Sequence, residues 1–89
     1  MKTKIIPMKS PQSGKAIPNQ NIIKADGKEF FQSYNTIIAM IDENGNVTLD
    51  PLWKTSSTTS KYRSIFLNES TKETHAKVVS GEYQIEDLN

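Results

Sequence analysis

Residues 36–49 read TIIAMIDENGNVTL and carry the clearest structural signal in the chain. An apolar run from Ile37 to Ile41 leads into a polar cluster, and Val47 begins a second β-favouring segment. Gly45, within that cluster, can supply the positive φ angle that a tight turn requires. The stretch therefore predicts a β-hairpin, and its continuously apolar first strand should be covered on both faces.

A second hairpin is predicted upstream of this stretch. Residues 21–25 and 28–32 favour β-structure and flank Asp26-Gly27, which is a two-residue turn signal. Near the other end of the chain, residues 82–85 alternate between polar and apolar side chains. This alternation predicts one more strand after the two hairpins.

Two short helices are expected between the second hairpin and the last strand. Apolar residues at helical spacing predict an amphipathic helix over residues 59–67. An S-x-x-E capping box at Ser70 and Glu73 opens a second, polar helix that ends at Gly81. Strands followed by helices indicate an α+β fold. We expect a small antiparallel sheet of two hairpins plus a C-terminal strand, with a short helical hairpin packed on one face.

The 89 residues fit one small domain, and the net charge of +1 hides an uneven distribution. Residues 1–24 hold five lysines and no acidic residue, so the rest of the chain is net acidic. Three prolines and Gly14 interrupt any helical period in this first segment. We therefore expect an extended, basic N-terminal arm over residues 1–17 and a single α+β domain over residues 18–89.

Composition excludes several kinds of site. The chain has no cysteine and a single histidine, His75, which rules out disulfides, thiolate metal sites and multi-histidine metal sites within one chain. We expect no metal and no cofactor. The apolar run behind the first lysines is too short for a signal peptide, and no stretch is long enough to span a bilayer. We expect no membrane association and a cytoplasmic location.

No pattern of titratable residues indicates catalysis. Asp42 and Glu43 fall in a hairpin turn, and Glu73 and Lys77 have the spacing of an ion pair on a helix surface. General acid–base chemistry needs a titratable pair held near one substrate, and these positions do not offer one. We therefore expect that the protein is not an enzyme and has no catalytic residues.

Several short strings between about residue 13 and residue 89 together resemble one family. They are Ser13-Gly14-Lys15, Pro18-Asn19-Gln20, Phe31-Gln32-Ser33-Tyr34, Thr58-Thr59-Ser60-Lys61-Tyr62-Arg63, Phe66-Leu67, Ser80-Gly81-Glu82-Tyr83 and Leu88-Asn89. The family consists of small proteins, encoded largely by bacteriophages and related mobile elements, whose domain has no known function. The resemblance implies a phage accessory protein in the cytoplasm of a bacterial host, with no assigned reaction and no residue roles to transfer.

Four aromatic residues are candidates for contact with a protein partner. Phe31 has a neighbour, Phe30, on the same strand, so the two point to opposite faces and one can remain near the surface. Tyr34 and Trp53 fall in connections, where a large aromatic is alternatively a lid on the core, and that is the commoner role. The candidate contacts are Phe31, Tyr34, Trp53 and Tyr62. We expect a non-enzymatic accessory protein that binds and modulates a host or phage protein, and the uneven charge also suits a homo-oligomer.

Nucleic-acid binding is the alternative function. Two short helices across a tight turn, followed by a strand, have the layout of a helix-turn-helix with a wing. The helical hairpin over residues 59–80 would act together with the basic arm. Its candidate contacts are Lys61, Arg63, Lys72, His75 and Lys77. Carboxylates on the second helix and at the C-terminus would face the same polyanion, so we expect nucleic acid to be the weaker candidate partner.

Overall fold

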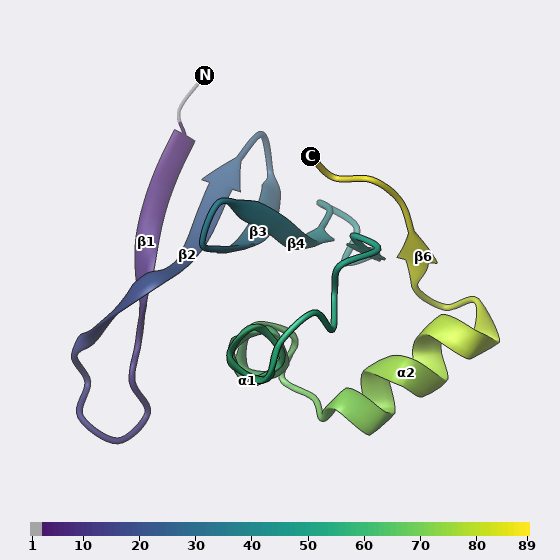
Figure 1. Cartoon of the computed structure of the whole chain (residues 1–89). Coiled ribbons are helices and arrows are strands. Elements are labelled where there is room, and N and C mark those ends of the chain that lie inside the picture. The colour runs from purple at the N-terminus through teal and green to yellow at the C-terminus, as the bar shows by residue number, and fades with distance from the viewer. Residues whose placement is uncertain (1–2) are drawn as a thin grey trace.

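The computed structural model describes residues 3–89 and contains a six-stranded sheet and two helices (Figure 1). The elements are β1 (Thr3–Lys9), β2 (Ala16–Ala25), β3 (Lys28–Ser33), β4 (Thr36–Ile41), β5 (Val47–Leu49), α1 (Ser57–Leu67), α2 (Thr71–Ser80) and β6 (Gln84–Ile85). The expected α+β fold is confirmed. Both helices lie on the same side of the sheet; α1 is seen end-on in Figure 1 and α2 from the side.

The strands lie in chain order across the sheet, from β1 at one edge to β6 at the other. Both expected hairpins are confirmed, β2 with β3 and β4 with β5, and both are antiparallel. Asp26 and Gly27 join the first hairpin with φ angles of 57° and 78°, which suit a two-residue turn between right-twisted strands. The last strand differs from the expected antiparallel arrangement, because the chain passes through both helices and returns with β6 parallel to β5.

The N-terminal segment belongs to the sheet, whereas a separate basic arm was expected. Strand β1 pairs antiparallel with β2, and the expected boundary between residues 17 and 18 falls inside β2. Met8 explains this placement, because its side chain is buried in the core. Pro7 is tolerated because β1 is an edge strand, and the register shifts between Pro7 and Lys9. Residues 1–2 of the expected arm lie outside the described residues.

Local capping signals position both helices. Helix α1 begins two residues before the expected start at Thr59, because the Ser56 side chain caps it by accepting a hydrogen bond from the Thr59 backbone N–H. The predicted capping box at the start of α2 is confirmed: Ser70 and Glu73 each accept a hydrogen bond from the other's backbone N–H. Gly81 ends α2 in the left-handed conformation.

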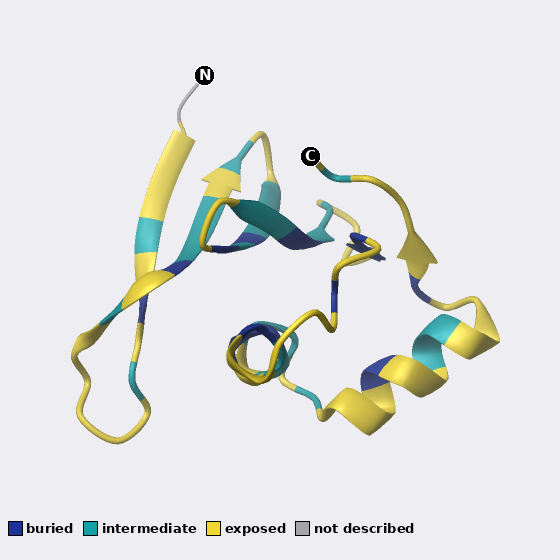
Figure 2. Cartoon of the chain, viewed as in Figure 1, coloured by how far each residue is buried: buried dark blue, intermediate teal, exposed yellow. Residues whose placement is uncertain are grey.

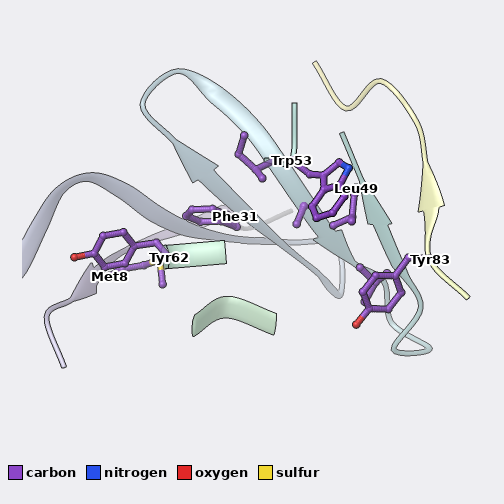
Figure 3. Close-up of a cluster of buried hydrophobic side chains, with 9 residues drawn as sticks. Met8, Phe31, Leu49, Trp53, Tyr62 and Tyr83 are labelled. Carbon is purple, nitrogen blue, oxygen red and sulfur yellow. The ribbon is translucent and has the colours of Figure 1, made fainter. Parts of the chain in front are cut away.

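The hydrophobic core lies between the sheet and the helices (Figures 2 and 3). Its buried apolar side chains are Met8, Phe31, Ile38, Ala39, Val47, Leu49, Trp53, Tyr62 and Tyr83. Phe31 of β3 stacks on Phe66 of α1, with ring centroids 5.9 Å apart. The sheet face that carries Phe31 is therefore the inner face of the fold.

The buried carboxylate of Asp50 holds the C-terminal residues beside the sheet through hydrogen bonds. Asp50 is only 3% exposed, and its oxygens accept hydrogen bonds from the backbone N–H groups of Leu52 and Leu88. The Asn89 amide donates to the same carboxylate and also bonds both backbone groups of Ile37. Burial raises the pKa of Asp50, but these hydrogen bonds outweigh it and hold the pKa below its ordinary value of 3.8.

Replacing this carboxylate should destabilise the fold in a pH-dependent way. We expect Asp50→Asn to lower the free energy of unfolding by about 2 kcal/mol at pH 7, because hydrogen bonds to a charged group are lost. The carboxylate contributes its full stabilisation above pH 3.8, and the contribution is lost as the pH falls through the lower pKa of the folded state. Urea unfolding at pH 7 and pH 3 measures both effects.

The difference between wild type and Asp50→Asn should therefore shrink at pH 3. Glu82→Gln is the matched control, because Glu82 is an exposed carboxylate in the same part of the chain. We expect this variant to unfold like the wild type at pH 7. Equal stability of Asp50→Asn and wild type at pH 7 would contradict the role assigned to Asp50.

Candidate protein-interaction surface

The structure buries three of the four aromatic residues that were candidates for partner contact. Phe31, Trp53 and Tyr62 are core residues (Figure 3), so they do not present an exposed contact surface. Tyr34 is different: it lies in the turn between β3 and β4 and is 55% exposed. Of the four candidates, only Tyr34 is available to a partner on the surface of this structure.

Arg63, a candidate nucleic-acid contact, is also buried. Its guanidinium is fully enclosed and donates hydrogen bonds to the Trp53 backbone carbonyl at 2.5 Å and to the Thr71 hydroxyl at 2.6 Å. It also lies over the Trp53 ring, 5.0 Å from the centroid. Burial lowers the pKa of Arg63, and the negative charge of Glu69 opposes this shift. The guanidinium therefore ties together the segment before α1, α1 itself and the start of α2, and it does not face a phosphate.

Lys77 is bound by a neighbouring carboxylate. Its Nζ lies 2.8 Å from an oxygen of Glu69, whereas the sequence had suggested Glu73, which instead caps α2. The Tyr83 hydroxyl and the Thr74 hydroxyl donate to the same Glu69 carboxylate. Burial raises the pKa of Glu69, but these hydrogen bonds outweigh it and hold the pKa below its ordinary value. The ion pair with Glu69 in turn raises the pKa of Lys77.

The other three candidate nucleic-acid contacts are exposed. Lys61 lies on α1, with its Nζ 5.4 Å from the Tyr62 ring centroid, and Lys72 and His75 lie on α2. The His75 ring is 6.4 Å from the Trp53 ring, centroid to centroid. Two of the five basic candidates, Arg63 and Lys77, are thus held within the fold, and the remaining exposed side chains are divided between the two helices.

A row of apolar side chains crosses the sheet face that the helices do not cover. Strand register places Ile5 opposite Ile23, Ile23 opposite Phe30, and Phe30 opposite Met40. We call these four side chains the outer row. Ile23, Phe30 and Met40 directly neighbour residues that pack into the core, namely Ile22, Phe31 and Ala39. Because successive side chains on a strand point to opposite faces, the outer row points away from the core.

The outer row is partly open to solvent. Ile5 is 62% exposed, and Ile23, Phe30 and Met40 are of intermediate exposure. Among the described residues, the partly buried apolar side chains that pack on the core are different ones: Ile17, Ile22, Ile41, Phe66, Leu67 and Val78. An antiparallel sheet with one solvated face normally carries polar side chains there. The outer row therefore has the character of a contact surface.

Charged side chains lie at the two edges of this outer face. On β1, the neighbouring Met8 points into the core, so Lys9 lies on the side of the outer row. At the other edge, Gln84 of β6 lies opposite Thr48 of β5, and Thr48 lies opposite Met40 of the outer row. Glu86 comes two residues after Gln84, so alternation places it on the same face. On the outer face, Lys9 thus lies at the β1 edge, Lys28 lies on β3 two residues before Phe30, and Glu86 lies at the β6 edge.

A second surface feature lies at the turn between β2 and β3. It is a hollow of about 330 Å³, lined by Lys4, Lys24 and residues 25–29. Lys4 and Lys24 are direct cross-strand neighbours, but Glu29 lies opposite Lys24 on its other side. Asp26 adds a second carboxylate to the lining. The hollow therefore has mixed charge and gives no strong preference for an anion.

Residues 3–89 hold neither a metal-binding cluster nor a membrane-spanning helix. No group of three or more histidine, aspartate or glutamate side chains is arranged to hold a metal ion. No helix in this range is long and apolar enough to cross a membrane.

Comparison with known proteins places the chain in a family. Residues 3–83 match the model of DUF8033, a family of unknown function, and the chain belongs to this family. No curated protein matches the chain, and no solved structure matches it. The expectation of a domain of unknown function is therefore confirmed, and the family match spans strands β1 to β5 and both helices.

Pairs of adjacent apolar residues in the sequence indicate the outer row, although the expectations above do not include it. Ile5-Ile6, Ile22-Ile23 and Phe30-Phe31 are pairs of adjacent apolar residues, and each pair places one apolar side chain on each face of its strand. Such pairs on neighbouring strands indicate that both faces of the sheet are apolar. The expectation of a strand covered on both faces, stated above for the run Ile37 to Ile41, therefore extends to these strands.

Removing the Arg63 guanidinium should strongly destabilise the protein. We expect Arg63→Ala to lower the free energy of unfolding by about 3 kcal/mol, because the carbonyl of the buried Trp53 loses its partner and the Thr71 hydroxyl loses a hydrogen bond from a charged group. Arg63→Lys should lose about half as much, because an ammonium reproduces only part of the bonding geometry. Urea unfolding followed by tryptophan fluorescence measures both. Lys61→Ala, an exposed change on the same helix, should match the wild type, and an equal loss there would contradict a special role for Arg63.

Proposed function

We propose that the protein is a non-enzymatic binding protein whose outer row contacts an apolar patch on a protein partner. The observation that carries this proposal is the alignment of Ile5, Ile23, Phe30 and Met40 across four neighbouring strands on the face without helices. Burying apolar surface is the dominant favourable term in protein association. A partner that covered this row would remove it from water.

The distribution of charge supports a protein partner over a nucleic acid. Duplex DNA is bound mainly through positive side chains that contact phosphates. In this chain Arg63 is enclosed and Lys77 is paired with Glu69, so the helices offer few free cations. The outer row itself carries no charge. The helical pair with the basic N-terminal segment stays the alternative site, acting through Lys61, Lys72 and His75.

The biological setting of this proposal rests on the resemblance described above. Strings spread over the chain from residue 13 to residue 89 resemble small proteins encoded by bacteriophages and related mobile elements. We therefore propose a phage-type accessory protein that acts in the cytoplasm of a bacterial host. There it would bind and modulate a host or phage protein through the outer row.

The central test of protein binding is a tagged pull-down from bacterial lysate with variants of the outer row. We expect wild type to retain a stoichiometric partner in about 0.5 M salt, because apolar contacts are screened little by ions. Phe30→Thr should lose the partner, since it removes the largest side chain of the row while keeping a β-favouring residue. Val79→Thr is the matched control, because Val79 is an apolar residue on α2 that is 73% exposed. Loss of the partner with Val79→Thr but not with Phe30→Thr would contradict the proposal.

Fluorescence anisotropy with labelled duplex DNA tests the alternative. We expect no binding at about 150 mM salt and protein concentrations up to about 10 μM, because Arg63 and Lys77 are held within the fold and leave the two helices with Lys61 and Lys72 as their unpaired cations. A binding curve that weakens steeply with added salt, and that Lys61→Glu with Lys72→Glu abolishes, would favour the alternative function. Phe30→Thr serves as the control, since it leaves the charges unchanged.

A further inference from the structure

We propose that a buried water molecule binds the side-chain amide of Gln20 on the inner face of the sheet. The same water bonds a hydroxyl group of the pair Ser33 and Thr59, and it thereby joins β2, β3 and the first turn of α1. This site lies on the opposite face from the outer row. The inference therefore goes beyond the proposed function and does not depend on it.

Gln20 carries a fully buried amide. It lies two residues before Ile22, which packs on the core, so its side chain points to the inner face, and its exposed fraction is 0%. Neither its Oε1 nor its Nε2 has a hydrogen-bond partner among residues 3–89. A buried amide is costly unless it is hydrogen-bonded, and in folded proteins such groups pair with protein or with ordered water. Because no described residue bonds this amide, ordered water is the partner that remains.

A second buried group beside Gln20 also needs a partner. Ser33 lies opposite Gln20 on β3, and its Oγ is 2.9 Å from the Thr59 Oγ1 in the first turn of α1. The Ser56 hydroxyl donates to the same Thr59 oxygen. These two hydrogen bonds use two of the three hydroxyl protons, so the third proton belongs to Ser33 or Thr59. Both residues are buried, and this proton therefore needs an acceptor inside the fold.

The sheet is irregular where Gln20 lies. Between the pairs Pro7–Asn21 and Lys9–Ala16, Met8 alone faces residues 17–20 of β2. The residue before Gln20, Asn19, has a left-handed φ angle of 66°. A bulge of this kind interrupts the ladder and bends the bulged strand, so the strands do not pack side by side as in a regular pair. The bulge therefore leaves space beside Gln20 that a regular ladder would close.

Water has the chemistry that this site requires. The amide oxygen needs a donor, whereas the amide nitrogen and the spare hydroxyl proton need an acceptor. The groups that form the site are neutral, so a buried ion would lack a counter-charge there. A buried water both donates and accepts, and it typically makes about three hydrogen bonds. One molecule can accept from the hydroxyl and donate to the Gln20 Oε1.

The water would hold α1 at a second point. Arg63 already joins the helix to the Trp53 carbonyl and the Thr71 hydroxyl. Thr59 lies one turn earlier on the same helix, and its bond to Ser33 connects it to the sheet. A fully bonded polar network permits one arrangement of its members. The water therefore extends the Ser33–Thr59 contact to β2 and fixes the first turn of α1 over two strands.

A high-resolution crystal structure of the full chain tests the site directly. We expect ordered density for a water within about 3 Å of a Gln20 amide atom and of the Ser33 or Thr59 oxygen. A Gln20 amide that bonds a protein group directly, with no water between them, would overturn the proposal.

Urea unfolding of Gln20→Met distinguishes a hydrated amide from an amide without a partner. Methionine is unbranched and apolar, so it replaces the side chain without its hydrogen bonds. We expect the unfolding equilibrium constant to rise about tenfold, because the water and the hydroxyl lose a partner. Gln32→Met, the same change on the other face of β3, should stay within about twofold of the wild type. A Gln20→Met variant as stable as the wild type, or more stable, would contradict the proposal, because removing an unbonded buried amide is favourable.

Variants of the two faces separate this site from the proposed function. Phe30→Thr changes the outer row and should keep the water at Gln20. Gln20→Met should still retain a protein partner in the pull-down. If the wild type has no water at Gln20, this inference fails and the proposed function stands. If the water is present but the pull-down retains no partner, the reverse holds.

Discussion

The fold depends on a buried guanidinium without a carboxylate against it. Arg63 donates hydrogen bonds to the Trp53 backbone carbonyl and the Thr71 hydroxyl and lies over the Trp53 ring, so it joins three parts of the chain: the segment before α1, α1 itself and the start of α2. A buried charge is costly unless it is hydrogen-bonded, so the three parts must meet in one arrangement. These contacts hold α1, α2 and the segment before α1 together as one unit over the inner face of the sheet. That placement leaves the opposite face to the outer row.

The sequence predicted the turns and helix ends, because their geometry depends on residues that are close together in the chain. Asp26-Gly27 specified a tight hairpin, and Ser70, Glu73 and Gly81 specified where α2 begins and ends, because turn and cap preferences act over only a few residues. Features that depend on distant contacts were harder to predict. The proline-rich start of the chain reads as an arm until Met8 is seen in the core, and β6 pairs parallel because two helices intervene.

The candidate interaction surface also combines features that local sequence predicts with features that depend on distant contacts. Alternation along β3 predicted that one of Phe30 and Phe31 would remain near the surface, and Phe31 was the expected contact. The structure buries Phe31 instead, because the face that the helices cover decides which of the two is enclosed. Arg63 follows the same rule: a basic residue on a short helix is usually exposed, and its burial follows from the position of Trp53 and Thr71 in space. Side-chain direction was therefore predictable, whereas its environment was not.

The two edges of the sheet restrict how far copies of this protein can assemble. Along β1, Pro7 lacks a backbone donor and the register shifts just after it, while β6 at the other edge is only two residues long. Both features discourage the addition of further strands, which is how exposed sheets grow into fibres. The chain can therefore keep an apolar surface for binding while its edges resist polymerisation.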